Sequence, residues 1–222
     1  MTIYCLNVTK IPEVPYEELR LMVSEERRKK ADSKKNLEDK YKCLYTELFL
    51  KYVFEENGFC TENFRLHYNE CGKPYFDETK FFNISHSGDW IVIAIGKSET
   101  GIDIEKIKDG RNKAFESVFK QVENDYINSF PEYEQSKYIT QIWTLKESYV
   151  KYLGKGILSE LKNFSVDALS KKVMTSNGEI LSDLKVDSIL LEDDYYLSFC
   201  SKEIVNEIKN VYSEDLRRTQ FL

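Results

Sequence analysis

The stretch from Trp90 to Glu105 constrains the fold of this chain more than any other part of the sequence. Residues 90–96 (Trp-Ile-Val-Ile-Ala-Ile-Gly) form a nearly continuous apolar run, which is typical of a strand buried on both faces. Residues 101–105 (Gly-Ile-Asp-Ile-Glu) then alternate isoleucines with carboxylates, as a strand with one dry and one wet face does. The sequence therefore predicts two consecutive strands, joined by a short polar bridge at 97–100.

The two acids on the second of these strands, Asp103 and Glu105, form the first candidate site. Side chains at i and i+2 of a strand point to the same side, roughly 7 Å apart. Two carboxylates at that spacing can reach one hard divalent cation such as Mg²⁺, which takes oxygen ligands and keeps some water for a phosphate substrate. The alternative is an exposed edge strand whose acids simply face water.

Charge and cysteine usage exclude several classes of protein. The net charge of −6 argues against nucleic-acid binding by the whole surface, although residues 27–42 form a local basic tract. The five cysteines are scattered without Cys-x-x-Cys spacing, so neither a disulfide framework nor a zinc site is expected. No signal peptide and no apolar run of membrane-span length is visible. We therefore expect a cytoplasmic protein without a membrane or nucleic-acid partner.

The remaining segments predict a mixed helix and strand content. A strand at 1–8 is followed by a short helix at Tyr16–Met22 and a helical tract at 25–56, with Ser24 as a capped start. Further predicted elements are strands at 64–68, 80–84, 164–168, 172–175, 186–190 and 195–200, helices at 113–128 and 133–153, turns at 71–75 and 85–89, a hairpin turn at Asn177-Gly178, and a polar tail from Glu203. We expect an α+β fold with its boundary at the polar bridge, between an N-terminal half 1–99 and a C-terminal half 100–222.

A third carboxylate stands in the predicted helix 133–153. Trp143, Glu147 and Lys151 recur every four residues and so share one helix face. Taken alone, Glu147 and Lys151 would make an ordinary surface ion pair worth about 0.3–0.5 kcal/mol. Beneath a strand with two free carboxylates, they would instead supply a third metal ligand and a phosphate contact.

Together these features resemble the 4′-phosphopantetheinyl transferases. Gly-Ile-Asp-Ile-Glu is followed about forty residues later by Trp-x-x-Lys-Glu-Ser-x-x-Lys at 143–151, and is preceded in the family's order by Gly72-Lys73-Pro74 and Phe82-Asn83-Ile84-Ser85-His86-Ser87. The likeness runs from near Ser24 to about Gly156 and fits the longer, pseudo-dimeric type that serves carrier domains of peptide, polyketide and siderophore synthases. It implies a monomer of two similar α+β halves related by a pseudo-two-fold axis, with coenzyme A and Mg²⁺ in the cleft between them.

The resemblance also implies a role for each matched residue. The implied metal ligands are Asp103, Glu105 and Glu147. The implied contacts to coenzyme A are Arg27, Lys30, Lys42, Lys73, Ser85, His86 and Lys151. Among these, Arg27 and Lys30 fall near the 3′-phosphate, the outlying phosphate to which Lys73 is also assigned, and Lys151 matches the lysine on the pyrophosphate. Glu147, Lys151 and His86 are the implied catalytic residues. The chain departs from the family at Lys42 and Thr46, where the family usually carries an arginine and a glycine. Lysine keeps the charge but loses the bidentate fork.

The implied reaction is transfer of 4′-phosphopantetheine from coenzyme A to a serine of an apo acyl or peptidyl carrier protein, with release of 3′,5′-adenosine diphosphate. Such a transfer needs charge neutralisation and alignment more than covalent help from the protein, and the residue types suit this need. The serine proton goes either to Glu147 or to a metal-bound water. Carrier recognition is expected to be mainly apolar, on the exposed side of 107–122, because an acidic carrier gains little from a protein of charge −6.

Two other functions compete with this interpretation. A metal-dependent phosphohydrolase or nuclease could use the same three acids, but the two histidines of the chain leave it without a second ligand cluster. A non-catalytic relative that binds coenzyme A or a carrier is the other alternative, and the presence of all of Asp103, Glu105, Glu147 and Lys151 argues against it. For His86 the alternative role is a turn histidine that caps the hairpin.

Overall fold

The structure, a computed structural model, describes residues 1–10, 14–62, 64–76, 81–108, 116–156, 160–212 and 215–216. The helices are α1 (Tyr16–Leu21), α2 (Glu25–Asp32), α3 (Leu37–Glu56), α5 (Gln121–Asn128) and α6 (Glu132–Leu153), with short 3-10 helices η1 (Val8–Lys10) and η2 (Glu116–Val118). The strands are β1 (Thr2–Asn7), β2 (His67–Tyr68), β3 (Pro74–Tyr75), β4 (Phe81–Ser87), β5 (Trp90–Gly96), β6 (Thr100–Lys106), β7 (Phe164–Asp167), β8 (Lys172–Thr175), β9 (Lys185–Leu191), β10 (Tyr195–Ser201) and β11 (Glu207–Val211). The mixed α and β content agrees with the predicted class.

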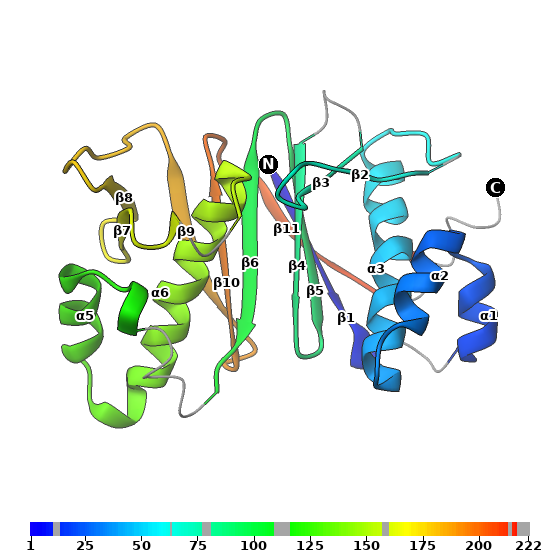
Figure 1. Ribbon diagram of the computed structural model, residues 1–222, viewed down its shortest axis with the longest axis horizontal. Helices are drawn as coiled ribbons and strands as arrows, with labels where there is room; N and C mark the ends of the chain where they lie inside the picture. The colour runs from blue at the N-terminus through cyan, green and yellow to red at the C-terminus, as the bar shows by residue number, and fades with distance from the viewer. Residues whose placement is uncertain are drawn as a thin grey trace.

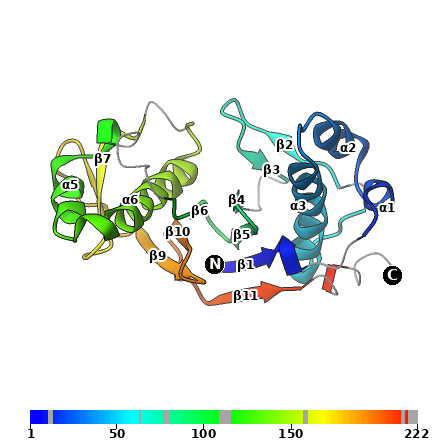
Figure 2. The ribbon, with the colours of Figure 1, turned by 90° about the horizontal axis from the view of Figure 1, so that it is seen from below.

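Two sheets form the centre of the molecule, and helices cover the outer side of each (Figures 1 and 2). The first sheet has the order β11-β1-β5-β4 and packs against α3, with α1 and α2 beyond it. The second sheet has the order β6-β10-β9 and packs against α6, with α5 beside it. Two-stranded ribbons, β2-β3 and β7-β8, complete the described strands.

The predicted central strand is confirmed. β5 lies between β1 and β4, antiparallel to both, and all of its residues except Gly96 are buried. Its side chains alternate between two cores, so that Ile91 and Ile93 pack toward α3 while Val92 and Ala94 pack toward the second sheet. An apolar side chain is needed on both faces, which explains the continuous apolar run.

The basic helix α2 is fixed to α3 through its first turn. The Ser24 hydroxyl accepts a hydrogen bond from the backbone N–H of Arg27, as expected of an N-cap. The carboxylate of Glu47, buried on α3, accepts from the backbone N–H and the hydroxyl of Ser24, both at 2.7 Å. A carboxylate beside the positive end of a helix is a favourable arrangement. The contact therefore holds the lysines and arginines of α2 above α3.

Helix α6 lies unusually close to β6, and Gly101 makes this possible. A Cβ at Gly101 would lie 1.9 Å from the carbonyl oxygen of Ser148 and 2.4 Å from the backbone nitrogen of Tyr152. Only glycine leaves room for the helix backbone at this point. The helix ends at Gly154, which adopts φ +67° as a left-handed cap.

A buried ion pair joins α6 to α5 and β7. Lys146 and Glu123 are both fully buried, and the Lys146 ammonium donates to both carboxylate oxygens at 2.9 and 3.0 Å and to the carbonyl of Phe164 at 2.9 Å. Glu123 also accepts from the backbone N–H groups of Lys120 and Val166. All three ammonium hydrogens have an acceptor, so the pair is fully satisfied.

The two sheets meet along β4 and β6, which are joined by side chains (Figure 1). The Asn83 amide oxygen accepts from the backbone N–H of Ile102 at 2.9 Å, and the Ser87 hydroxyl accepts from that of Lys106 at 3.1 Å. The hydroxyl of Ser85 donates to Asp103 at 2.8 Å. We call this junction the seam. Because polar side chains replace a backbone ladder here, chemically active groups can stand between the sheets.

Several sequence-based boundaries differ from the structure. The predicted turn 85–89 is wrong, because β4 continues to Ser87 and the turn falls at 88–89. The polar side chains that indicated a turn face the seam, where Asp103 and Glu105 bind them. Of the predicted helix 113–128, residues 113–115 lie outside the described ranges, and the rest is divided into η2 and α5. The predicted strand 64–68 is limited to β2 in the part that the structure describes.

The polar tail from Glu203 contains a strand that the sequence did not indicate. β11 runs parallel to β1, with Thr2 opposite Glu207 and Leu6 opposite Val211. Its composition is polar because it forms an edge of the sheet, and only Val211 is buried. In the described part of the chain, every helix is too short or too polar to cross a membrane.

Candidate active site

Asp103 lies at the centre of the candidate site, where the seam meets α6. Its side chain is 4% exposed. Oδ1 accepts hydrogen bonds from Lys151 Nζ at 2.6 Å and from the Ser85 hydroxyl at 2.8 Å, and Lys151 also donates to that hydroxyl at 2.9 Å. The structure thus brings together three residues that the sequence placed on three separate segments.

The other carboxylate oxygen of Asp103, Oδ2, is buried and has no hydrogen-bond partner among the residues that the structure describes. Burial raises the pKa of Asp103 above its usual value, Lys151 and Ser85 oppose this rise, and the negative charge of Glu105 adds to it. A buried carboxylate oxygen without a partner is costly, and a bound cation would remove that cost. Asp103 therefore has the properties of a metal ligand.

The other two predicted metal ligands lie on β6 and α6. Glu105 follows Asp103 on the same face of β6, and its Oε2 accepts from the Ser87 hydroxyl at 2.6 Å. Glu147 is buried on α6, one turn before Lys151. Within the described ranges, no three acidic, histidine or cysteine side chains gather closely enough to hold an ion by themselves. The donor set fits Mg²⁺ bound at Asp103 and Glu105 if substrate oxygens and water supply further ligands.

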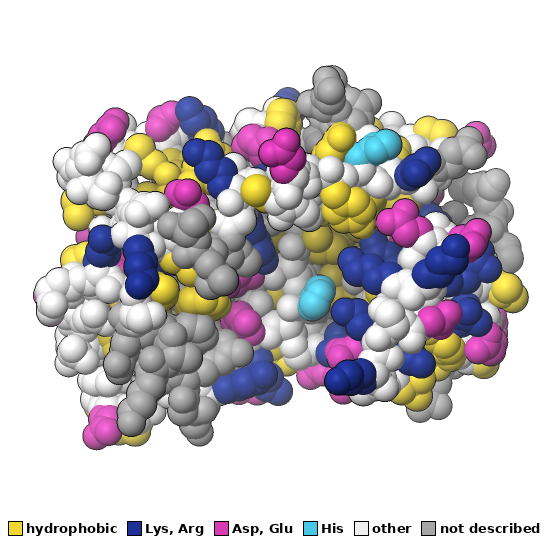
Figure 3. All heavy atoms as spheres, viewed as in Figure 1, with side chains coloured by type: hydrophobic (Ala, Val, Ile, Leu, Met, Phe, Trp, Pro, Cys, Tyr) yellow, Lys and Arg dark blue, Asp and Glu magenta, His cyan; other side chains and the backbone are white. Residues whose placement is uncertain are grey.

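A basic cavity of about 350 Å³ opens beside this centre, between α2, α3 and β4. Its charged lining includes Arg27, Lys30, Lys34, Lys42 and His86. A second cavity of about 350 Å³ lies on the other side of Arg27 and Lys30 and is also bordered by Arg65. Figure 3 shows basic side chains gathered beside the hollow in the middle of this face, over α2 and α3. Clustered cations of this kind favour phosphate groups.

Two of the predicted phosphate contacts already have protein partners. The Arg27 side chain is 9% exposed, and its Nε lies 3.6 Å from Glu47 Oε2. Lys42 Nζ donates to the carbonyl oxygen of Gly88 at 3.0 Å and to Glu38 at 3.2 Å. These contacts fix both cations at the wall of the basic cavity, and Lys42 links α3 to the turn after β4.

His86 lies on β4 and points into the basic cavity, not into a turn cap. The surrounding walls lower the pKa of His86 below its usual value, chiefly by desolvation, and the positive charges of Lys151, Lys42 and Lys34 lower it further. The ring is therefore biased toward its neutral form, which can donate one hydrogen bond to a phosphate oxygen.

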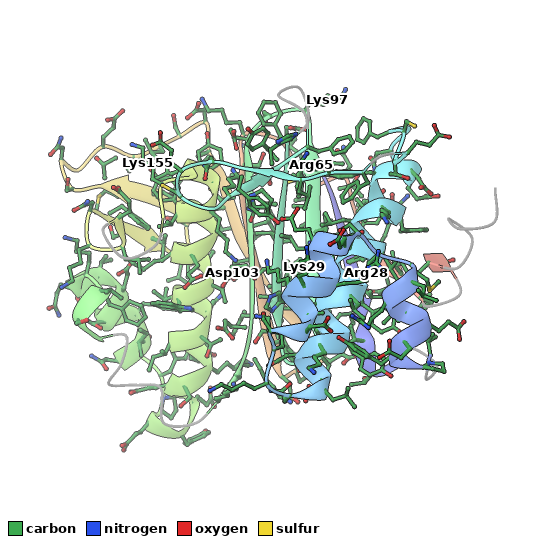
Figure 4. The ribbon with its side chains drawn as sticks, turned by 45° about the vertical axis from the view of Figure 1, so that its right-hand side comes forward. Arg28, Lys29, Arg65, Lys97, Asp103 and Lys155 are labelled. Carbon is green, nitrogen blue, oxygen red and sulfur yellow. The ribbon has the colours of Figure 1, made fainter. Side chains whose placement is uncertain are left out.

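Lys73 borders a third cavity, of about 210 Å³, together with Lys151. Lys73 Nζ forms an ion pair with Glu99 at 2.6 Å. Gly72, Pro74 and Ile84 line both this cavity and the basic cavity, so the two are adjacent parts of one groove across β4. In Figure 4, Asp103 lies between α6 and α2, which carries Lys29 toward the viewer.

The structure also identifies supporting residues that the sequence analysis did not single out. Lys146 is part of the Trp-x-x-Lys-Glu motif, yet its side chain is buried and pairs with Glu123. The lysine of α6 that pairs with Asp103 is Lys151. Glu47 holds α2, and Asn83 holds the seam. The alternation of Asn83, Ser85 and Ser87 was a signal for a polar strand face, whereas nothing in the sequence marked Lys146 as buried.

Comparison with known proteins agrees with this site. A family model described as the 4′-phosphopantetheinyl transferase superfamily matches residues 99–200, which include β6 and α6. The 4′-phosphopantetheinyl transferase gsp of Aneurinibacillus migulanus is 33% identical over 167 residues, covering 75% of this chain and 70% of the relative. A 4′-phosphopantetheinyl transferase of Bacillus subtilis is 34% identical over 155 residues, covering 68% and 69%. The acids on β6, Lys151 on α6 and these relatives all agree, and the chain belongs to the 4′-phosphopantetheinyl transferase superfamily.

Proposed function

We propose that this protein transfers 4′-phosphopantetheine from coenzyme A to a serine of an apo carrier protein. The observation that carries the proposal is the groove, which runs from the basic cavity at Arg27 and Lys30 to the contact between Lys151 and Asp103. Coenzyme A has the matching layout, with a 3′-phosphate on its adenosine at one end and, further along, the pyrophosphate that contains the reacting bond. A groove with cations at one end and acids with a lysine at the other suits this molecule.

In this proposal the basic cavity holds the adenosine end. Arg27 and Lys30 contact the 3′-phosphate, and Lys42 stands behind them at the cavity wall. Ser85 and His86 lie between this end and the acid strand, so they contact the phosphates next to the reacting bond. Lys73 and Lys151 approach the pyrophosphate from the third cavity. Each cation is thus assigned to a phosphate by its position along the groove.

Asp103 and Glu105 would hold Mg²⁺, with Glu147 as the third ligand, and the bound ion would neutralise and orient the pyrophosphate. The serine oxygen forms a bond to the β-phosphorus while the bond from that phosphorus to the bridging oxygen breaks. The bridging oxygen leaves with 3′,5′-adenosine diphosphate. Lys151 and His86 donate to the negative charge that develops, and the serine proton passes to Glu147 or to water.

The proposal also covers the domain organisation, the oligomeric state and the cellular location of the protein. We assign 1–99 and 100–222 to two α+β halves related by a pseudo-two-fold axis, with the groove along the seam between them and with β11 of the second half crossing back to pair with β1 of the first. Each sheet has helices and a core cluster of its own, which supports this assignment. We also assign the protein a monomeric state and a cytoplasmic location, to which its five unpaired cysteines are suited.

The carrier is proposed to dock by apolar contacts beside the groove, on the exposed side of 107–122. Residues 109–115 of this surface lie outside the described ranges, and Val122 on α5 is 45% exposed. Truncation of Val122 should raise the KM for the carrier and leave the KM for coenzyme A unchanged. A larger effect from reversing the charge of neighbouring Lys120 would contradict the apolar assignment.

The deciding experiment is intact-mass spectrometry of an apo peptidyl carrier domain incubated with this protein, coenzyme A and Mg²⁺. We expect the carrier to gain the mass of one phosphopantetheine, and we expect no gain when EDTA is present during the incubation. Asp103→Ala should abolish the gain, while Asp183→Ala, which alters an exposed ion pair with Lys202, should not. Binding of coenzyme A without any mass gain would favour a non-catalytic relative. Release of inorganic phosphate would favour a phosphohydrolase.

A further inference from the structure

The ribbon formed by β2 and β3 crosses from the α3 side of the molecule to the end of α6 (Figures 1 and 2). The five residues 69–73 connect its strands, and we call them the 69–73 turn. Both views place this turn over the seam, beside the C-terminal end of α6. The ribbon is therefore a second connection between the two walls of the groove.

Asn69 organises this turn from within. Its amide oxygen accepts hydrogen bonds from the backbone N–H of Cys71 at 3.0 Å and of Lys73 at 2.8 Å. Its own backbone N–H donates to the carbonyl of Lys73, and its carbonyl accepts from Gly72, which adopts φ +80°. An asparagine that bonds the backbone two residues ahead is a common means of closing a turn.

Asn69 also attaches the turn to α6. Its amide nitrogen donates to the carbonyl oxygen of Gly154 at 3.1 Å, which is a helix-terminal carbonyl without a partner inside the helix. A Cβ at Gly154 would lie 3.5 Å from the same amide nitrogen and 3.4 Å from Cδ of Lys73. The turn thus rests directly on the cap of the helix that carries Lys151.

Lys73 is held by the same arrangement. Its ammonium donates to Glu99 Oε2 at 2.6 Å and to the carbonyl oxygen of Thr100, the first residue of β6, at 3.4 Å. Its backbone N–H is fixed by Asn69. Lys73 and Lys151 then line one cavity from its two sides, the turn and the helix.

We propose that Asn69 is a positioning residue which ties the 69–73 turn to α6 and so sets the width of the groove between Lys73 and Lys151. This inference rests on the proposed function, in which both lysines contact the pyrophosphate of coenzyme A. Asn69 itself does not touch the reacting atoms. Its loss removes the hydrogen bond between the turn and the helix and leaves the Lys73 ammonium held by Glu99 and Thr100, so coenzyme A must order the backbone of the turn when it binds.

The first test is Asn69→Ala, with Glu70→Ala in the same turn as the matched control. Asn69→Ala removes the hydrogen bond to Gly154 and the two that the amide oxygen accepts within the turn. Calorimetry with coenzyme A should give a Kd at least roughly three- to tenfold higher for this variant, the change that corresponds to the tie to α6 alone. The KM for coenzyme A should rise by the same factor while kcat changes less than twofold. Hydrogen exchange at Cys71 and Lys73 should accelerate, and thermal unfolding should show that the fold is intact.

The second test restores the tie by a different bond. A Cβ at Gly156 would lie 3.9 Å from the Cβ of Cys71, within the usual range for a disulfide. Gly156 adopts φ +76°, which strains a cysteine, and this strain is present in both of the proteins compared. We would add Gly156→Cys to Asn69→Ala in a Cys60→Ser background, which removes the other exposed thiol. Oxidation, verified by mass spectrometry, should return the Kd to within about twofold of the Gly156→Cys, Cys60→Ser protein, and dithiothreitol should reverse the gain.

The outcomes separate this inference from the proposed function. If the unaltered protein binds coenzyme A and Asn69→Ala binds it equally well, the positioning role is wrong and the function stands. The role is also wrong if the verified disulfide leaves the weakened Kd unchanged. If the unaltered protein neither binds coenzyme A nor modifies a carrier, the proposed function fails first and the role fails with it.

Discussion

Gly101→Ala should damage both the stability and the activity of this protein, because the added methyl group meets backbone atoms. The Cβ would lie 1.9 Å from the Ser148 carbonyl oxygen and 2.4 Å from the Tyr152 nitrogen, whereas real Cβ atoms essentially never approach closer than 3.0 Å. Since neither atom belongs to a flexible side chain, α6 must move away from β6 by about 1 Å or more.

The magnitude follows from what this movement separates. Overpacking of a well-packed interior costs about 1–3 kcal/mol, and for a chain of this length each kcal/mol lowers the melting temperature by roughly 2–4 °C. The same shift moves Lys151 away from Asp103, which it now contacts at 2.6 Å. A displacement of about 1 Å in a catalytic group can lower the rate by roughly 100-fold. We therefore expect a folded protein with a lower melting temperature and little transfer.

The assays are urea denaturation for the free energy of unfolding and mass spectrometry of a carrier domain for the transfer rate. Gly96→Ala is the matched control, since it adds the same methyl group to the neighbouring strand β5. There the nearest atom, at 2.7 Å, is an oxygen of the Glu203 side chain, so the methyl group displaces a side chain and its hydrogen bonds to residues 97–98 instead of the backbone of α6. Full stability and full activity for Gly101→Ala would refute the reasoning, because α6 would then not depend on glycine at this position.

Three further predictions follow from the same contacts. Lys146→Met should lower the free energy of unfolding by about 3–5 kcal/mol, because Glu123 would keep a buried charge without its cation. The double variant Lys146→Met with Glu123→Gln should recover part of this loss, and urea denaturation measures both values. Lys30→Ala should weaken binding of coenzyme A more than binding of dephospho-coenzyme A, whereas Lys73→Ala should weaken both equally. If calorimetry gave the reverse pattern, Lys73 would be assigned to the 3′-phosphate and Lys30 to the pyrophosphate. The pKa of His86 is lowered in the folded state, so the unfolded chain binds the proton more readily. The stability that this group contributes is therefore present above pH about 6.5 and is lost as the pH falls through the folded pKa. His86→Asn should flatten the pH dependence of the melting temperature in that range, and an unchanged slope would contradict the lowered pKa.

The sequence predicted an element correctly where all the side chains on a face of that element pack in the same kind of environment. β5 was identifiable because both of its faces are apolar, and α3 because Leu44, Leu48 and Phe49 all face one core. The acid strand and the helix of Lys151 were identifiable as separate pieces. Their contact through Ser85 was not, since a sequence does not show which side of a sheet a later helix covers.

The prediction failed where polar side chains face other polar side chains inside the protein. Residues 85–87 resembled a turn because their hydroxyls and imidazole are typical of solvent-exposed segments, yet two of the three bind or border the acids of β6. Nothing in the sequence marked Lys146 as buried either, although Glu123 and the carbonyl of Phe164 accept all three of its ammonium hydrogens. Burial of a polar group depends on its partner, and the partner is distant in sequence.

The pairing of β1 with β11 has a consequence for the order in which the chain can acquire its structure during synthesis. The two strands align Thr2 with Glu207, so one edge of β1 has no partner until residues 207–211, about 200 positions later, have left the ribosome. At about 5–20 residues per second, the wait lasts on the order of ten to forty seconds. An unpaired strand edge is a template for association with other chains. Newly made chains should therefore depend on chaperones that shield this edge, and slower translation should lower the soluble yield.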